Sequence, residues 1–284
     1  MGAIKTVSIV GVGLIGGSFS LALRRVGYRG TILGVSSPST SSRALDRGVI
    51  DEACALDAAL PRSDLVYMAQ PVLRIVGELE RVRQLVPDRA LVTDAGSTKV
   101  VIVERARELF SSGPDFIGGH PMAGREGRGV EFAQADLFDG ATYALVPTGD
   151  DLPDSPVATE FGALLDAMGC HRKVMRAADH DRIVGWTSHM PQLVSTALAA
   201  AISDHLAEPG DLEIAGDGLR DMTRLAASPH EVWADILRTN QGAIDKAIEA
   251  FIREMESLRK ALSKDAAEKH FERAQSLRAR LPGP

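Results

Sequence analysis

The chain has 284 residues, of which 45% are hydrophobic and 25% charged, and its formal net charge at pH 7 is −6. This composition is typical of a globular protein with one large or two ordinary domains, and it offers no basic stripe for nucleic acid. No apolar run reaches the roughly 18 residues of a membrane span. Residues 1–5 lead directly into a strand, so we expect no signal peptide and a cytoplasmic protein.

The first half of the chain alternates short β-branched runs with helical patterns. A glycine-rich turn follows the first run, and an apolar helix is predicted over residues 15–25. This alternation predicts an α/β fold with a parallel sheet covered by helices on both faces. The predicted strands span residues 6–10, 31–35, 64–69, 90–94 and 115–118.

A further strand is predicted at 142–146, followed by a helix at 157–168 with Gly169 as its C-cap and an edge strand at 171–175. We therefore expect a Rossmann-type domain over residues 1–176. Cys54 and Cys170 match no metal-ligand spacing, so the sequence predicts two buried, reduced thiols and no metal site.

Residues 177–284 show no convincing strand, and the longest helical stretch runs from Glu231 to about Ser263. Apolar residues recur there at spacings of four and three, as in a coiled-coil seam. Such a seam fits either a helix packed inside its own domain or a dimer interface, and we expect an all-helical domain that forms a homodimer. The seam consists of Ile244, Ile248, Phe251, Met255, Leu258 and Leu262.

The turn after the first strand carries the pattern G-x-G-x-x-G, formed by Gly11, Gly13 and Gly16. Alone this pattern is weak evidence, but here it follows a strand and opens a helix. The glycines permit a tight turn, close approach of a pyrophosphate and close packing of helix on strand. We therefore predict a dinucleotide cofactor, with Leu14 and Ile15 at the helix N-terminus, and further cofactor contacts from Gln70, Pro71 and Asp94.

The end of the second strand lacks the acidic residue that usually holds the ribose 2′-hydroxyl of NAD. Ser36 and Ser37 stand there instead, and Arg43 follows. Hydroxyl groups and an arginine suit a 2′-phosphate, so we expect NADP to be used at least as well as NAD. A neutral pocket that does not discriminate between the two cofactors is the alternative.

Two segments at the ends of predicted strands carry side chains suited to catalysis. Ser97 follows the strand at 90–94, and His120 lies in a Gly-Gly-His-Pro string after the strand at 115–118. Both can face the crevice at the carboxyl edge of the sheet. There His120 could accept a hydroxyl proton while hydride leaves the same carbon. Alternatively, Ser97 is a helix N-cap and His120 a turn residue.

Two further segments lie in the helical half. His189 precedes a proline and could project into the crevice between the domains, whereas His180 and Asp181 are expected to form a helix start. Arg220 and Arg224 could clamp a carboxylate. The alternative is that these arginines form surface ion pairs with nearby aspartates.

Together these segments resemble the prephenate and arogenate dehydrogenase family, and the resemblance covers almost the whole chain. The Gly-Gly-His-Pro-Met-Ala-Gly and Ser-His-Met-Pro strings are specific, whereas the glycine fingerprint is not. Residues 36–53 look closest to NADP-linked arogenate enzymes. A region around Ser228 lacks an Asp that many relatives carry, so no specificity residue is assigned there.

The resemblance implies a Rossmann domain, a dimerising helical domain, and oxidative decarboxylation of prephenate or arogenate in tyrosine biosynthesis. It implies that His120 draws off the substrate hydroxyl proton with help from Ser97. The implied substrate-binding residues are His189, Arg224, Glu126, Arg220 and Trp233.

The sequence also fits two other functions. A different two-domain dehydrogenase, of the β-hydroxyacid or imine-reductase type, shares the first strand and helix but lacks the Gly-Gly-His-Pro string. A non-catalytic dinucleotide-binding sensor would bind the cofactor without turnover. The joint presence of Ser97, His120 and Arg224 argues against the sensor.

Overall fold

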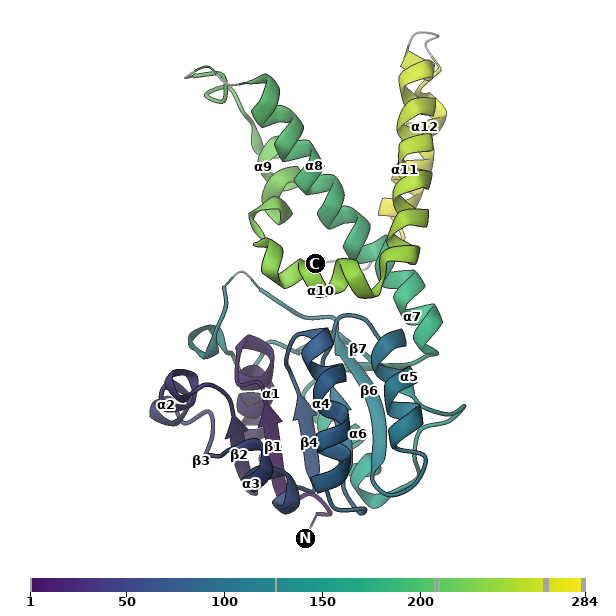
Figure 1. Cartoon of the computed structure of the whole chain (residues 1–284). Helices are drawn as coiled ribbons and strands as arrows, with labels where there is room; N and C mark the ends of the chain where they lie inside the picture. Colours follow the sequence, from purple (N-terminus) through teal and green to yellow (C-terminus); the bar gives the residue numbers. More distant parts are fainter. Residues whose placement is uncertain (1, 126, 207, 209, 263–265, 282–284) are drawn as a thin grey trace.

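The computed structural model describes residues 2–125, 127–206, 208, 210–262 and 266–281. The N-terminal part is a sheet with helices on both faces, and the C-terminal part is helical and stands on one end of it (Figure 1). This arrangement agrees with the predicted fold class. Helix α7 (Ala177–Val184) leads from the sheet domain into the helical domain.

The sheet has the strand order β3-β2-β1-β4-β5-β6-β7-β8 among the described residues. Each predicted strand is present, and a short edge strand, β3, was not predicted. The strands are β1 (Thr6–Val10), β2 (Thr31–Val35), β3 (Glu52–Ala53), β4 (Leu65–Met68), β5 (Leu91–Asp94), β6 (Asp115–Pro121), β7 (Thr142–Pro147) and β8 (His171–Val174).

The sheet is parallel from β3 to β6, as the sequence predicts, and its direction changes at β7. β7 runs antiparallel to β6, and β8 runs parallel to β7. Among its described residues, the connection between β6 and β7 carries only the short turn η2 (Val130–Phe132) and no crossover helix, so the chain returns in the opposite direction. Helix α6 (Pro156–Ala167) then provides the crossover from β7 to β8.

Two apolar cores lie on opposite faces of the sheet because the central strands are buried on both sides. One core joins the strands to α1 (Leu14–Arg25) and α6, and the other joins them to α4 (Val72–Leu85) and α5 (Val100–Leu109). The smaller helices of this domain are α2 (Pro38–Asp46), α3 (Leu56–Ala59) and η1 (Leu60–Arg62).

The prediction of two buried thiols is correct for Cys170 and wrong for Cys54. Cys170 is 6% exposed, and burial raises the pKa of its thiol to about 11. Cys54 is only partly buried because it follows the two-residue edge strand β3, where one side of the sheet faces solvent.

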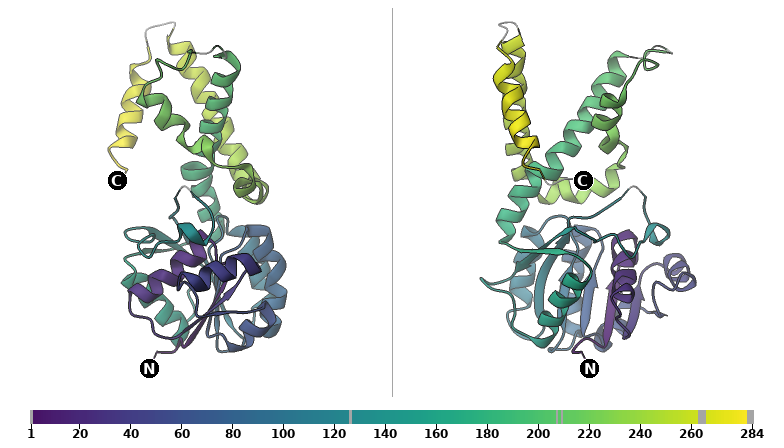
Figure 2. Two further views of the ribbon diagram at one scale, coloured as in Figure 1. Left: turned by 90° about the vertical axis from the view of Figure 1, so that its left-hand side faces the viewer. Right: turned by 180° about the vertical axis from the view of Figure 1, so that it is seen from behind.

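The helical domain forms two diverging arms (Figure 2). The predicted continuous helix from Glu231 to Ser263 is wrong, because Asn240 interrupts it with non-helical backbone and Ser263 lies outside the described residues. The elements are η3 (Gly185–His189, a π-helical turn), α8 (Met190–His205), α9 (Asp217–Thr223), η4 (Arg224–Ala227), α10 (His230–Thr239), α11 (Gln241–Leu262) and α12 (Glu268–Arg278).

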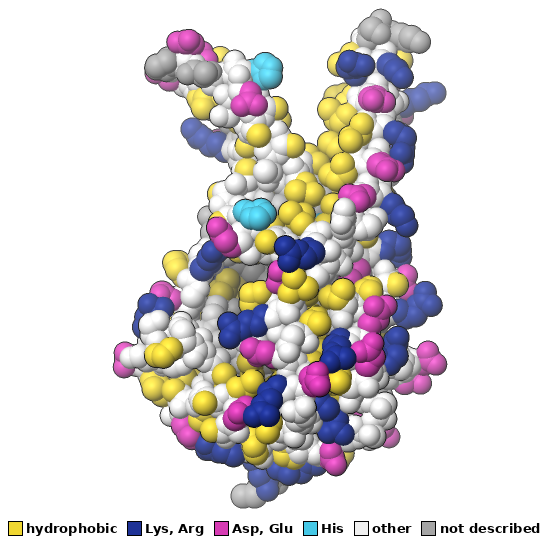
Figure 3. Space-filling view, viewed as in Figure 1, with side chains coloured by type: hydrophobic (Ala, Val, Ile, Leu, Met, Phe, Trp, Pro, Cys, Tyr) yellow, Lys and Arg dark blue, Asp and Glu magenta, His cyan; other side chains and the backbone are white. Residues whose placement is uncertain are grey.

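Hydrophobic side chains gather along the facing sides of the two arms (Figure 3). The base of the α11 seam packs inside the domain, since Ile244 is only 5% exposed. Further along, Met255 is 49% and Leu262 is 67% exposed. No helix in the described ranges is both long and apolar enough to cross a bilayer.

Candidate active site

The glycine-rich turn between β1 and α1 has the geometry of a phosphate-binding loop. Gly11 adopts a φ of +98°, and a Cβ on Gly16 would collide with the backbone oxygen of Gly11. A Cβ on Gly13 would meet no described atom within 4 Å, so the space above the turn is open. Gly13 is the N-cap of α1 and has no side chain to occupy the first N–H groups, which can bind phosphate oxygens.

The loop before α4 borders this turn. A Cβ on Gly11 would touch the side chain of Gln70, and Pro71 is the N-cap of α4. The Gln70 amide nitrogen donates to Glu78 at 3.2 Å, and its Oε1 is buried with no hydrogen-bond partner among the described residues. An orphaned acceptor beside an open glycine turn fits a dinucleotide that carries hydroxyl or amide donors.

The backbone around the end of β5 is held by a buried ion pair between Asp94 and Lys99, both fully buried. Asp94 also accepts the N–H groups of Gly96 at 2.8 Å and Gly119 at 3.1 Å, and Lys99 donates to the Gly119 carbonyl at 2.7 Å. The carboxylate of Asp94 is therefore fully hydrogen-bonded inside the protein, and a cofactor contact from this residue stays a prediction. The carboxylate fixes the strand ends that carry the site.

Three side chains form a hydrogen-bonded chain across the domain boundary. Nδ1 of His120, at the end of β6, lies 2.8 Å from Nε2 of His180 in α7, and Nδ1 of His180 lies 2.7 Å from Asp181. The Asp181 carboxylate accepts from Nδ1 of His180, so a singly protonated His180 ring accepts at Nε2. His120 must then donate through Nδ1, which leaves a lone pair on its Nε2.

The imidazole of His120 is neutral at physiological pH. Burial, together with the neighbouring His180, Lys99 and His189, holds its pKa well below the usual value. A neutral ring with Nε2 unprotonated is the form that can accept a proton. The chain Asp181–His180–His120 therefore presents an unprotonated ring nitrogen, suited to accepting a proton, at the carboxyl edge of the sheet.

The structure adds His180 and Asp181 to the candidate site, where the sequence had not placed them. They lie in the middle of α7 and are buried, at 1% and 4% exposure, and are not a helix start. The Asp181 carboxylate also accepts the N–H groups of Lys99 at 2.7 Å and Val100 at 2.9 Å and so caps α5. No signal in the sequence indicated this, because the burial of the His-Asp pair is visible only in the structure.

Ser97 lies half-buried in the connection between β5 and α5. It is not the helix N-cap, since Lys99 occupies that position and Asp181 supplies the capping oxygens. The alternative role considered for Ser97 in the sequence is therefore excluded. Its position between Asp94 and Lys99 sets it beside the strand end that carries His120.

His189 lies at the end of the turn η3 and is only 1% exposed. Its ring packs edge-on against Trp233 of α10, with centroids 5.9 Å apart, and its Nδ1 lies 3.1 Å from the amide nitrogen of Asn240. Burial lowers the pKa of His189 to about 4. The indole N–H of Trp233 is buried and has no hydrogen-bond partner in the described chain, as expected of a donor that serves a ligand.

Of the predicted carboxylate-binding residues, Arg220 is exposed on α9 and forms an ion pair with Asp217 at 3.7 Å. For Arg220, this ion pair matches the alternative given above, a surface arginine paired with a nearby aspartate. Arg224 begins η4, which packs against α8. The predicted residue Glu126 lies outside the described residues.

The tip of β2 carries no carboxylate, as the sequence indicated. Ser36 is exposed, and Ser37 is the N-cap of α2, where its hydroxyl accepts the N–H of Thr40 at 3.3 Å. Arg43 lies one turn further on and forms an exposed ion pair with Glu131 of η2 at 3.4 Å. The nearby cation is therefore already paired, through an exposed contact, with a carboxylate from another part of the chain.

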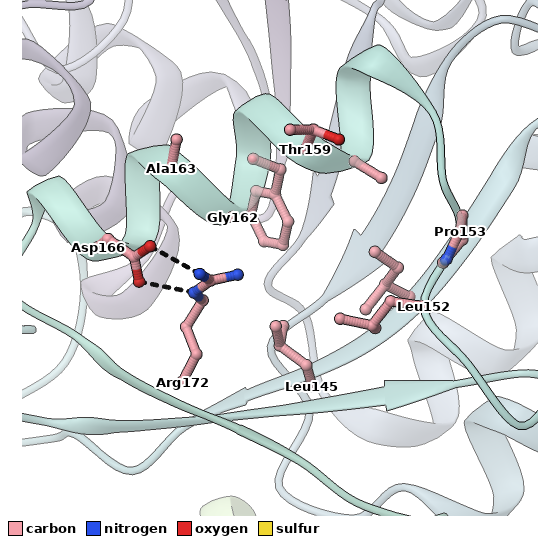
Figure 4. A pocket seen from close by; sticks show the side chains of 11 residues that line it. Leu145, Leu152, Pro153, Thr159, Gly162, Ala163, Asp166 and Arg172 are labelled. Atoms are coloured by element: carbon pink, nitrogen blue, oxygen red, sulfur yellow. Dashed lines mark hydrogen bonds and ion pairs between the residues drawn. The ribbon is translucent and has the colours of Figure 1, made fainter.

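A cavity of about 390 Å³ lies elsewhere, between α6 and strands β6 and β7 (Figure 4). Its polar groups are Thr159 and the ion pair of Arg172 with Asp166, whose Nε–Oδ1 distance is 2.6 Å. None of its lining residues belongs to the glycine turn or to the chain of histidines. We therefore assign the active site to the edge of the sheet and not to this cavity.

Two family models match the chain. The model described as the nucleotide-binding domain of prephenate dehydrogenase matches residues 19–161, and the one described as its dimerization domain matches residues 176–276. A prephenate dehydrogenase of Bacillus subtilis is 32% identical over 98% of this chain and 76% of its own length.

Two solved structures are similar throughout. The prephenate dehydrogenase of A. aeolicus in complex with hydroxyphenyl propionate and NAD+ is 31% identical, with a TM-score of 0.86 over 97% of this chain and 96% of that one. The arogenate dehydrogenase of Synechocystis is 30% identical, with a TM-score of 0.80 over 96% of this chain and 99% of that one.

Proposed function

The chain belongs to the prephenate dehydrogenase family of oxidoreductases, and on this basis we propose that it catalyses the oxidative decarboxylation of prephenate or arogenate in tyrosine biosynthesis. The observation that carries the proposal is the chain Asp181–His180–His120. It presents the lone pair of His120 Nε2 at the sheet edge that also carries the glycine turn.

The reaction removes a hydride from the ring carbon that bears the hydroxyl group and carbon dioxide from the opposite ring carbon. The nicotinamide, when bound, accepts the hydride. His120 takes the hydroxyl proton through Nε2 and returns it to the same oxygen as the ring becomes a phenol. The product is 4-hydroxyphenylpyruvate from prephenate or tyrosine from arogenate.

The remaining site residues bind and orient the substrate in this proposal. Arg224 grips a substrate carboxylate, and His189 and Trp233 donate hydrogen bonds from their ring N–H groups to substrate oxygens. Ser97 hydrogen-bonds the reacting hydroxyl and aligns it with His120. Buried, pre-oriented groups of this kind favour catalysis because they need little reorganisation in the transition state.

The cofactor is held by Gly11, Gly13 and Gly16 and the N-terminus of α1, with Gln70 as a further acceptor. We propose that NADP is used at least as well as NAD, because the tip of β2 has no carboxylate to repel a 2′-phosphate. We also propose a homodimer built from the helical arms, whose apolar residues Met255 and Leu262 are exposed in one chain.

The test is the rate of NADH and NADPH production by the purified chain with each substrate. We expect turnover with prephenate, arogenate or both. The variant His120→Asn should still bind the cofactor and lose roughly 100-fold or more in turnover, as for a lost general base. Cofactor binding without reduction in the presence of either substrate would instead support a sensor.

A further inference from the structure

Asn240, at the break between α10 and α11, connects the two histidines of the site. It is 6% exposed, and its amide nitrogen donates to the backbone carbonyl of Asp181 at 2.8 Å. The same nitrogen lies 3.1 Å from Nδ1 of His189. We propose that Asn240 is a positioning residue that holds His189 in the tautomer with its proton on Nε2. The part that this tautomer plays in substrate binding rests on the proposed function.

The orientation of the Asn240 amide follows from its partner. The Asp181 carbonyl can only accept, so the amide atom that faces it must be the NH₂ group, since the flipped amide would set two oxygens against each other. An NH₂ group has only hydrogens to offer to a second neighbour. His189 Nδ1 must therefore supply the lone pair in this contact.

The charge state of His189 completes the assignment. The ring is buried, which disfavours its charged form and lowers its pKa. The charge of Asp181 raises this pKa, whereas His180 lowers it further. A neutral imidazole carries one proton, and with Nδ1 as the acceptor that proton lies on Nε2. His189 is therefore a hydrogen-bond donor at Nε2.

Asp181 thus sets opposite tautomers for the two site histidines. Its carboxylate acts through His180 and leaves His120 Nε2 as an acceptor. Its backbone carbonyl acts through Asn240 and leaves His189 Nε2 as a donor. One ring can take the hydroxyl proton, and the other can bind a carboxylate or carbonyl oxygen of the substrate.

The first test is ¹⁵N NMR of the wild-type His189 ring at neutral pH in the full chain. We expect a protonated Nε2 and an unprotonated Nδ1. The opposite assignment would overturn the proposal. This measurement needs no substrate, so its result does not depend on the proposed function.

The second test is Asn240→Asp, which replaces the donor by an acceptor of the same shape. His189 should then donate through Nδ1 and lose its Nε2 proton. We expect the KM for the substrate to rise about tenfold or more, with the KM for the cofactor unchanged. The loss should shrink at acidic pH, where the new carboxylate favours a doubly protonated ring.

The matched control is Gln241→Glu, the same amide-to-acid change at the next residue, which is exposed. It should leave both KM values and their pH dependence unchanged. Identical behaviour of the two variants would show that Asn240 does not position His189. If Asn240→Asp fails to fold, the NMR assignment decides alone.

Discussion

Nε2 of His180 lies 2.8 Å from Nδ1 of His120, and this contact links the helical domain to the end of strand β6. The proposed base, His120 of the sheet domain, therefore depends on a residue of the helical domain. Two further contacts cross the same boundary, from Asp235 to the N–H of Leu73 at 3.0 Å and between Thr98 and Thr239 at 2.8 Å. The site is therefore assembled only when the two domains are docked.

The first prediction concerns His180. His180→Gln removes the ring that accepts the His120 Nδ1 proton, so His120 can adopt the wrong tautomer. We expect turnover to fall roughly 10-fold to 100-fold with little change in cofactor affinity. The control is His171→Gln, an exposed histidine on β8. Equal turnover in both variants, measured by steady-state kinetics, would show that His120 needs no partner.

The second prediction concerns stability in acid. The pKa of His189 is about 4 in the folded protein, below the ordinary value of 6.5. As the pH falls, His189 therefore binds a proton in the unfolded chain before it does so in the folded protein. Between about pH 6.5 and about pH 4, this residue lowers the free energy of unfolding by about 3 kcal/mol. Above pH 6.5 both states are neutral and the effect vanishes.

Urea denaturation at several pH values measures this effect. His189→Gln should flatten the decline of the unfolding free energy between pH 6.5 and 4, whereas His171→Gln should not. A remaining slope is expected, because His120 also has a depressed pKa and acts in the same direction. Parallel pH curves for wild type and His189→Gln would contradict the buried, neutral state of this ring.

The third prediction is that Arg224→Ala mainly raises the KM for the substrate. The loss of a charge-assisted contact with a carboxylate should cost about 1.5–3 kcal/mol, or roughly 10-fold to 150-fold in KM. Arg105→Ala serves as the control, because this arginine forms ion pairs with Glu80 and Glu108. A normal KM together with a lower melting temperature would assign Arg224 a structural role instead.

The fourth prediction is that the arms hold a dimer. The double substitution Met255→Asp and Leu262→Asp places charge on exposed apolar positions. It should therefore weaken association of the two chains without disturbing the fold of each. The control is Ser257→Asp, an exposed polar position on the same helix. Light scattering should show dimers for wild type and control, and monomers for the double variant. A monomeric wild type would end the proposal.

Much of the fold was predictable because its signals are local. The β-branched runs, the glycine turn and Gly169, with a φ of +83° after α6, each determine structure from neighbouring residues. The direction of β7 was not predictable in this way. It depends on which neighbour the strand pairs with, and the loop after Pro121 has no pattern that reveals the missing crossover helix.

The site residues show the same difference between local sequence signals and contacts that are distant in sequence. His120 was found because it follows a strand in an unusual Gly-Gly-His-Pro string. His180 was missed because its partner lies 60 residues away, and a histidine on a helix gives no sign of what it faces. The partners of Asp94 were hidden for a related reason, since only the structure shows that its carboxylate binds Lys99 and two backbone N–H groups.

The last prediction concerns the choice between NAD and NADP. The nearest candidate cation for a 2′-phosphate is Arg43, which is paired with Glu131 at 3.4 Å, and both side chains are about half exposed. An exposed pair of this kind is weak, so a phosphate can compete for the arginine. Glu131→Gln should free Arg43 and raise the efficiency with NADP relative to NAD by roughly 2-fold to 10-fold.

Ser36→Asp tests the same pocket from the other side, because it restores a carboxylate at the tip of β2. It should accept the ribose hydroxyls of NAD, repel a 2′-phosphate and shift use toward NAD. Glu104→Gln, an acid-to-amide change on α5 away from the pocket, is the control for Glu131→Gln. The measurement is kcat/KM with both cofactors on one substrate. A strong NAD preference in the wild type that Glu131→Gln leaves unchanged would mean that neither Arg43 nor the bare tip of β2 selects the cofactor.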